Sequence, residues 1–169
     1  MLTTEQLQSF CALPSDARTY MHTPMRVGAW VYATNAHYCV RVPAGDEPEA
    51  VKAPTKMHAL FEKHAATEFV PMPTFAKAPT CAECNGTGIW YDDEFLGDDE
   101  CLACFGRGFE KWHRTRIGDA EFELGYLNKL AALPGVAICT RGRTDPMTLR
   151  FDGGEALLMP MHPLDEAKS

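Results

Sequence analysis

The chain has 169 residues, of which 46% are hydrophobic and 23% charged, a composition typical of one globular domain with an insertion or of two small domains. No apolar run approaches the roughly eighteen residues that a membrane span needs, and the N-terminus lacks the pattern of a signal peptide. We therefore expect no membrane association and a cytoplasmic location. The formal net charge of −7 opposes binding to a phosphate backbone, so nucleic acid is not favoured as a partner, although a local basic patch could still contact it.

The first 43 residues predict a short helix followed by a hairpin. Residues 4–13 have apolar positions at helical spacing, and a proline ends this pattern. Residues 25–33 and 38–43 read as strands, with residues 34–37 as the turn between them.

The middle of the chain, residues 44–80, differs in composition. An acidic loop at 44–49 precedes a short helix over about residues 55–65. Three prolines then interrupt regular structure before the cysteines begin: Pro71, Pro73 and Pro79.

From residue 112 the sequence again predicts ordinary α+β structure. Residues 114–124 read as a strand and residues 125–133 as a helix that ends at a Pro-Gly pair. Three further strands are predicted, the last two joined by a glycine-containing tight turn: residues 136–140, 147–151 and 156–161.

Four of the seven cysteines form two matching motifs. Residues 81–88 and 101–108 both follow C-x-x-C-x-G-x-G. Two cysteines three apart in a tight turn bring both sulfurs to one ion, and a second such turn completes a tetrahedron. The glycines allow the backbone to turn so that its N–H groups face the thiolates. The sequence thus predicts one structural zinc ion held by Cys81, Cys84, Cys101 and Cys104.

Two other uses of these cysteines are disfavoured. Four thiolates leave no open position for water or substrate, so the zinc is not expected to be catalytic. Neither pair begins a helix after a strand, as a thioredoxin-like redox motif would. The remaining three cysteines lie in apolar surroundings and indicate free buried thiols in a reducing compartment: Cys11, Cys39 and Cys139.

The repeated motif resembles the cysteine-rich zinc module of DnaJ-type co-chaperones, over residues 81–108 alone. Those modules usually carry four copies of the motif and bind two zinc ions, whereas this chain has two copies and one expected ion. The His-Pro-Asp tripeptide of the J-domain does not occur in the chain. The resemblance implies a zinc-stabilised segment and, as an alternative function, a DnaJ-like protein that binds unfolded polypeptide.

Between the cysteine pairs lie four large apolar residues among six acidic ones. One interpretation is a partner-binding finger in which these side chains are anchors within a charged rim. The other is a solvated hairpin whose aromatic rings pack back on the protein, and the sequence leaves both open. The candidate anchors are Trp90, Tyr91, Phe95 and Leu96.

A basic cluster follows the second motif, interleaved with Phe109 and Trp112. This pattern could contact phosphates or bases, but we favour the interpretation that its members pair with neighbouring acids. The cluster consists of Arg107, Lys111, His113, Arg114 and Arg116.

The remainder of the chain resembles the C-terminal domain of bacterial DNA polymerase sliding clamps. The resemblance rests on residues 117–118, 124–130, 147–151 and 157–161, the last of which contains Leu-Met-Pro-Met. It implies a single α+β, sliding-clamp-like domain, made of two helix-on-antiparallel-sheet half-units with an inserted zinc hairpin module. We expect residues 1–43 and 112–162 to form this discontinuous domain, residues 44–111 to be the insertion, and residues 163–169 to be a flexible tail.

The same resemblance implies a hydrophobic groove for short peptides, lined at the matching positions Met159, Pro160 and Met161. The helices predicted over 4–13 and 125–133 carry only one basic residue between them, so a ring around DNA is not expected. No hydrolase, metalloprotease or phosphate-binding motif occurs, and we expect neither enzymatic activity nor a small-molecule substrate. We therefore expect a clamp-like, zinc-binding protein-interaction module, and the clamp resemblance suggests an accessory of DNA replication or repair in a phage or mobile element as its setting.

Overall fold

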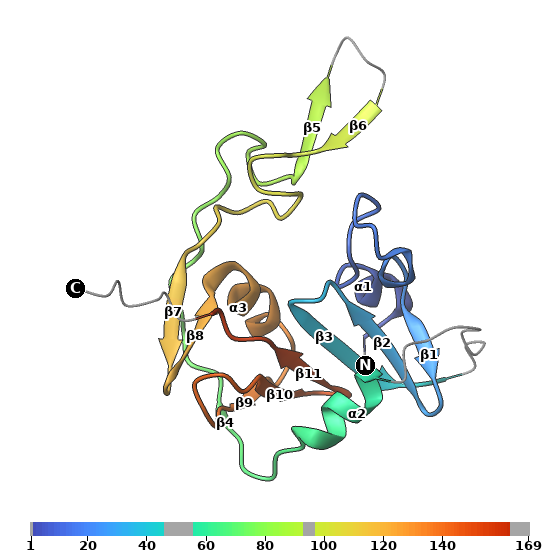
Figure 1. The fold of residues 1–169 in the computed structure, drawn as a ribbon, viewed down its shortest axis with the longest axis vertical. Helices are drawn as coiled ribbons and strands as arrows, with labels where there is room; N and C mark the ends of the chain where they lie inside the picture. The colour runs from blue at the N-terminus through green and yellow to red at the C-terminus, as the bar shows by residue number, and fades with distance from the viewer. Residues whose placement is uncertain (1, 46–55, 93–96, 163–169) are drawn as a thin grey trace.

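The computed structural model describes residues 2–45, 56–92 and 97–162. It is an α+β structure built on one antiparallel sheet, with a narrow two-stranded hairpin rising from it (Figure 1). The sheet has the order β1 (Met25–Val27), β2 (Trp30–Thr34), β3 (Tyr38–Pro43), β11 (Gly154–Leu158), β10 (Met147–Phe151), β9 (Ala137–Cys139) and β4 (Val70–Pro71).

The centre of the sheet joins the two ends of the sequence. Strands β3 and β11 pair antiparallel, with Val40 opposite Ala156 and Cys39 opposite Leu157. The hairpin of β10 and β11 turns at Asp152-Gly153, where Gly153 has a φ of 87°. This turn agrees with the glycine signal in the sequence, because only glycine adopts such a backbone conformation without steric cost.

Two segments predicted as single strands are hairpins instead. Residues 25–33 divide into β1 and β2 at Gly28, which has a φ of 58°. Residues 114–124 divide into β7 (Arg114–Ile117) and β8 (Ala120–Glu123) at Gly118, which has a φ of 59°. In both segments residues of high strand propensity lie on either side of the glycine, so propensity alone does not reveal that the chain reverses there.

One face of the sheet carries the main hydrophobic core. Helices α1 (Thr4–Gln8) and α3 (Leu124–Ala131) cover it together with β8, and a Thr3 capping box begins α1. Because side chains alternate along strands, one face collects the apolar residues of five strands. The core combines Leu7 of α1 and Phe10 of the turn after it with Leu127 and Leu130 of α3. The sheet contributes Val31, Ala33, Val40, Val42, Ile138, Leu149, Phe151 and Leu158.

The opposite face is partly covered by helix α2 (Lys56–Lys63), through Phe61. Arg41 lies on this face with its guanidinium 4.2 Å from the ring centroids of both Trp30 and Phe61. Its Nη2 donates a 2.5 Å hydrogen bond to Glu155. A planar guanidinium suits such a stacked arrangement, so Arg41 fixes α2 against the sheet.

The described part of residues 44–111 therefore has two structural roles. Helix α2 and strand β4 belong to the sheet layer, since β4 pairs with β9. The cysteine motifs and the hairpin of β5 (Ile89–Asp92) and β6 (Gly97–Glu100) project away from it (Figure 1). Residues 163–169, the predicted tail, lie outside the described residues. In the described residues no helix is long and apolar enough to cross a membrane.

Helix α3 approaches the chain that leaves the metal module very closely at Gly125. A Cβ added there would lie 2.1–2.3 Å from the ring of Phe109, which packs edge-on against Tyr126 at 5.6 Å. Any larger residue at 125 must displace this ring.

Gly125→Ala is therefore expected to destabilise the protein by about 1 kcal/mol. Alanine gains about 1 kcal/mol of helix propensity over glycine, but overpacking against Phe109 costs about 1–3 kcal/mol. Urea unfolding monitored by circular dichroism measures the change. In a Phe109→Leu background the same substitution should become neutral or stabilising, and equal destabilisation in both backgrounds would contradict this account.

Candidate metal centre

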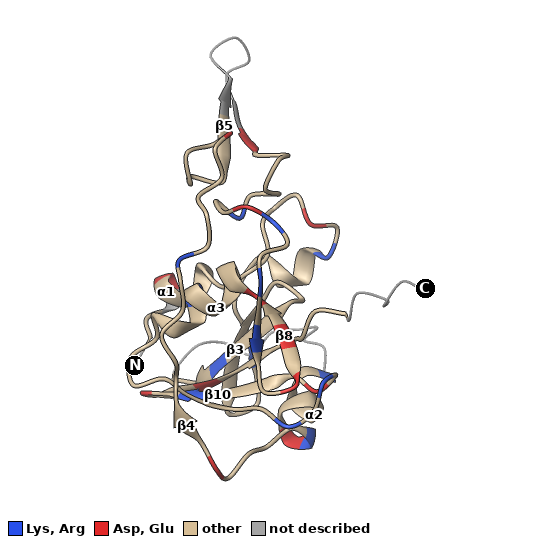
Figure 2. Ribbon diagram, turned by 90° about the vertical axis from the view of Figure 1, so that its left-hand side faces the viewer, with Lys and Arg blue, Asp and Glu red and all other residues tan. Residues whose placement is uncertain are grey.

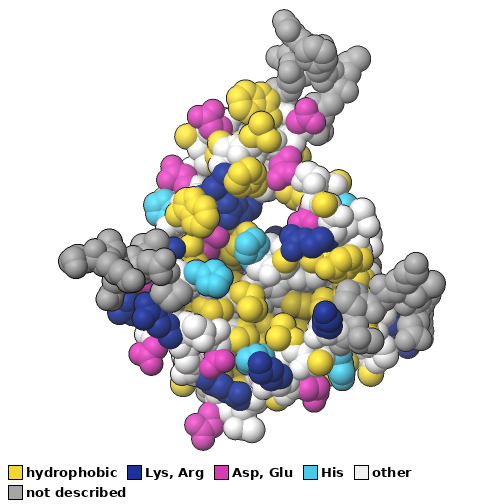
Figure 3. Space-filling model, in the orientation of Figure 1, with side chains coloured by type: hydrophobic (Ala, Val, Ile, Leu, Met, Phe, Trp, Pro, Cys, Tyr) yellow, Lys and Arg dark blue, Asp and Glu magenta, His cyan; other side chains and the backbone are white. Residues whose placement is uncertain are grey.

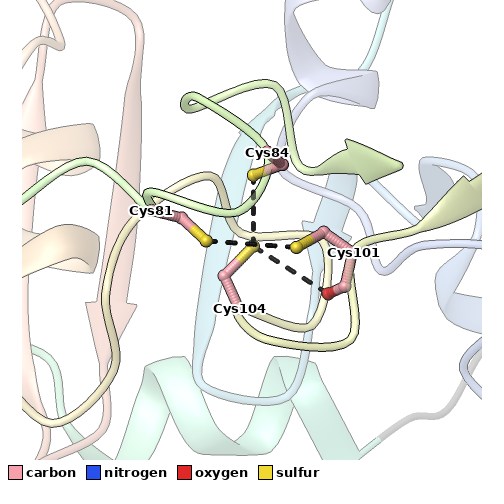
Figure 4. Close-up of side chains that lie close together, drawn as sticks. All are labelled: Cys81, Cys84, Cys101 and Cys104. Atoms are coloured by element: carbon pink, nitrogen blue, oxygen red, sulfur yellow. Dashed lines mark hydrogen bonds between the residues drawn. The ribbon is translucent and has the colours of Figure 1, made fainter. Parts of the chain in front are cut away.

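The two cysteine motifs bring four sulfur atoms together in a buried cluster (Figure 4). The Sγ atoms of Cys81 and Cys101 are 3.9 Å apart, and those of Cys84 and Cys104 are 3.7 Å apart. All four lie within 4.8 Å of one another. A tetrahedral ion with metal–sulfur bonds of about 2.3 Å separates its sulfurs by about 3.8 Å. The cluster therefore has the spacing that one tetrahedral thiolate-bound ion requires.

Each motif forms a knuckle, here defined as residues 81–88 or 101–108, with the same backbone path. The residue after the second cysteine has a φ of 50° at Asn85 and 51° at Phe105. The last glycine then donates its N–H to the second cysteine, with Gly88 N 3.3 Å from Cys84 Sγ and the equivalent bond also 3.3 Å in the other knuckle. Such N–H donors stabilise thiolates, which is the role that the sequence assigns to the glycines.

The knuckles also lock together through their glycines. A Cβ at Gly88 would lie 2.4 Å from the carbonyl oxygen of Gly106, and a Cβ at Gly108 would lie 2.4 Å from that of Gly86. Each knuckle also donates one backbone hydrogen bond to the other. The N–H of Cys81 donates to Gly108 O, and the N–H of Cys101 donates to Gly88 O. The two motifs are thus related by an approximate two-fold axis through the sulfur cluster.

The charge state of the thiols follows from this environment. Burial opposes ionisation of Cys84, but the N–H groups of Gly88 and Gly86 outweigh it and hold the pKa of Cys84 at about 6. Burial raises the pKa of Cys104 to about 12. A bound cation removes this asymmetry, because it stabilises every thiolate that contacts it.

Three hydrogen bonds fasten the second knuckle and Glu100, the residue before it, to the sheet domain. Arg107 donates to both carboxylate oxygens of Glu123 at 2.9 and 3.0 Å, and both side chains are largely buried. The hydroxyl of Ser15 donates to Glu100. Sequence reasoning did not identify Glu123 and Ser15, because no local pattern relates residues that are sixteen and eighty-five positions from their partners.

The proposed finger residues are only partly described. Trp90 lies in β5 with half of its side-chain surface exposed (50%) and does not pack on the sheet domain's core. Tyr91 is placed in β5 by its backbone. Phe95 and Leu96 lie outside the described residues.

Most of the basic cluster after the knuckles is paired with acids. Lys111 is the exception, and its Nζ lies 3.1 Å from the centroid of the Phe105 ring. Basic and acidic segments are correspondingly interspersed on the face shown in Figure 2. These contacts are the ones expected if the cluster serves the neighbouring acids: Arg107 with Glu123, His113 with Glu110, and Arg114 and Arg116 with Glu121.

The Met-Pro-Met segment follows the last strand, since β11 ends at Leu158 rather than at residue 161 as predicted. The N–H of Met159 donates to His37 O and that of Met161 to Glu121 O, so the chain leaves the sheet toward β8. Met159 lines a cavity of about 240 Å³, whereas Pro160 and Met161 do not. The cavity lies between α2 and the 3₁₀ turn Thr19–Met21, and its other apolar walls include Met21, Met57, Leu60 and Leu157.

A comparison of the chain with protein families, curated proteins and solved structures finds no match. The four-cysteine cluster and the α+β architecture therefore rest on this chain's own residues. The resemblances to DnaJ-type modules and to sliding clamps remain sequence-based expectations.

The glycine packing between knuckles predicts that Gly88→Ala and Gly108→Ala each weaken zinc binding by about tenfold or more. In either variant the new methyl group collides with a facing carbonyl and separates the two sulfur pairs. Zinc titration against a chromophoric chelator measures the affinity. Gly28→Ala is the matched control, because Gly28 also has a positive φ but has no atom within 4 Å of an added Cβ. Unchanged zinc affinity in the two knuckle variants would contradict this packing.

Proposed function

We propose that this chain is a non-enzymatic protein-interaction module organised by one structural zinc ion. The observation that carries the proposal is the buried set of four sulfurs at tetrahedral spacing. Four thiolates fill the coordination sphere, so the ion has no position for water or substrate and its role is to order the chain.

Zinc is the metal that suits this donor set and this role. Tetrahedral sulfur sites in proteins hold zinc or iron, and zinc has no redox chemistry. Apart from the metal ligands, the module has no hydrophobic core of its own among the described residues, since its buried cluster consists of the four cysteines alone. An ion is therefore the main force that can hold this segment in one shape.

Two surfaces support binding to a protein partner. Trp90 presents an exposed indole on the projecting hairpin, beside the acidic residues Asp99 and Glu100. The cavity beside Met159 offers an apolar recess on the sheet domain, where a partner's hydrophobic side chain would be buried. More specifically, we propose that the module is an accessory of DNA replication or repair in a phage or mobile element. This role rests on the sequence resemblance of residues 157–161 to sliding clamps.

The second candidate function is a DnaJ-like protein that binds unfolded polypeptide. Two large apolar side chains of the second knuckle favour it, because Leu102 and Phe105 are 76% and 57% exposed. An aggregation assay with a model substrate distinguishes the two functions, since only the chaperone-type function predicts zinc-dependent suppression of aggregation.

Removal of zinc is expected to unfold residues 81–108 and to leave the seven-stranded sheet folded. In zinc-finger peptides a structural zinc contributes about 10–16 kcal/mol of apparent binding free energy, which this segment cannot replace by apolar packing. Hydrogen exchange with and without a chelator measures protection along the chain, and metal analysis of the untreated protein should give one zinc per chain. Loss of protection throughout the sheet would show that the module is not a separable structural unit.

Partner binding is tested by quantitative affinity capture with Trp90→Ala and Met159→Glu variants. If the hairpin and the cavity are interaction surfaces, at least one variant should lose a partner that the unaltered protein retains. Val70→Ala is the matched control, because Val70 is 60% exposed on β4 at the edge of the sheet and outside both surfaces. Identical capture by all variants would contradict both assignments.

A further inference from the structure

A second, larger cleft lies between the zinc module and the sheet domain. Its volume is about 690 Å³, within the range of sites that bind small molecules or peptide side chains. Figure 3 shows this face, with hydrophobic and basic side chains gathered around a hollow below the projecting hairpin. The walls come from the loop after α1, the β2–β3 turn, the second knuckle and α3.

Phe105, in one wall of this cleft, is unusual for its backbone conformation. Its φ is 51°, in the left-handed region that bulky residues rarely adopt, and its ring is 57% exposed. The equivalent residue of the first knuckle is Asn85, at a φ of 50°, and asparagine tolerates this conformation well. The fold of the knuckle therefore does not require an aromatic residue at 105.

Trp112 lines the same cleft and also combines a left-handed backbone conformation with an exposed side chain. Its φ is 71° and its side chain is 71% exposed. A left-handed tryptophan that buries little of its indole contributes little to folding, and such outliers concentrate at functional sites. Phe105 and Trp112 thus both have an unfavourable positive φ, and both expose an aromatic side chain in the same cleft. This combination indicates a binding surface.

The cleft is lined by three carboxylates and three cationic side chains, and most of them are paired with one another. Arg18 pairs with Asp16, Arg107 pairs with Glu123, and the carboxylate of Glu100 accepts a hydrogen bond from Ser15. His37 stacks on Tyr126, and burial lowers the pKa of its imidazole, so it adds no charge at neutral pH. A polyanion such as nucleic acid would meet almost no net positive charge here.

Lys129, on α3, is the exception among these groups. Its ammonium donates to the carbonyl of Ser9 and lies 5.2 Å from the Phe10 ring and 5.7 Å from the Tyr38 ring. An ammonium has three N–H donors, and no carboxylate pairs with this one among the described residues. A carboxylate entering the cleft would supply the missing partner for a charge that is already largely withdrawn from water.

We propose that this cleft binds a polypeptide segment that carries a large apolar side chain beside a carboxylate. The apolar side chain packs against Phe105 and Trp112, and the carboxylate pairs with Lys129. The carboxylate is that of an acidic side chain within the segment, which can extend from the backbone to the Lys129 ammonium beside the Phe10 and Tyr38 rings. The inference rests on the proposed role as a protein-interaction module and assigns to that role a site distinct from Trp90 and Met159.

Two peptide arrays probed with the full-length, zinc-loaded protein test the proposal. One array presents random sequences with free C-terminal carboxylates, and the other presents amidated sequences with a fixed internal glutamate. Dissociation constants of the best binders are then measured by fluorescence anisotropy for four variants: Phe105→Asn, Trp112→Ala, Lys129→Gln and Leu102→Ala. Phe105→Asn introduces the residue found at the equivalent position of the first knuckle, Asn85. The zinc content of each variant shows that its metal module is folded.

Peptides of the internal-glutamate array should bind, and the best binders should carry a large apolar residue beside the glutamate. Peptides whose only carboxylate is the C-terminus should not bind. Phe105→Asn, Trp112→Ala and Lys129→Gln should each weaken binding by about tenfold, and Lys129→Gln should also remove its salt dependence. Leu102→Ala should bind normally, because Leu102 is exposed on the same knuckle but does not line the cleft.

Three results would overturn the proposal. The first is no binding to the internal-glutamate array. The second is binding by the three cleft variants that equals binding by the unaltered protein. The third is preferential binding of a single-stranded oligothymidine probe through the same residues. Peptide binding that survives the cleft substitutions but is lost in Trp90→Ala would overturn this site and leave the proposed interaction function standing.

Discussion

The structure of the projecting segment depends on the close approach of two glycine pairs around four sulfurs. Gly88 faces the carbonyl of Gly106, and Gly108 faces that of Gly86, at distances that no side chain tolerates. This contact sets the separation of the knuckles and therefore the separation of the sulfurs. Four buried thiols so close together would repel one another as thiolates, so the arrangement is electrostatically complete only with a cation at its centre.

The close approach of the two knuckles also determines which of their side chains can contact the sheet domain or a partner. Because a bound ion would order a segment that has no apolar core among its described residues, the outward side chains of the knuckles are not needed for packing. They can therefore face solvent or a partner. The second knuckle is nevertheless not independent of the sheet domain, since Arg107 is paired with buried Glu123 and the following chain packs on α3 at Gly125. Metal binding is thereby coupled to the geometry of the cleft between the two parts, whose walls include residues from both.

Sequence reasoning succeeded where the signal was local. The clustering of the four cysteines follows from their spacing, α2 and α3 from helical periodicity, and the β10–β11 turn from its glycine. Each of these depends on residues close in the chain. It missed the turns at Gly28 and Gly118, since residues of high strand propensity lie on both sides of each glycine. It could not assemble the cleft, in which residues from position 9 to position 129 meet, because no local pattern encodes contacts over such separations. The order of strands in the sheet, with β3 beside β11, belongs to the same class of long-range information.

The approximate symmetry of the two knuckles separates what the metal site needs from what it does not. Cysteines and glycines recur at a spacing of twenty residues, the glycines have positive φ values in both knuckles, and these repeated positions build the site. The position after the second cysteine differs, with Asn85 in one knuckle and Phe105 in the other, although both have the same left-handed backbone. Phenylalanine fits this backbone conformation less well than the asparagine at the same position of the first knuckle. The presence of Phe105 is therefore not explained by the fold of the knuckle itself. Its exposure in a cleft shared with a second left-handed aromatic residue, Trp112, indicates a role in binding rather than in folding.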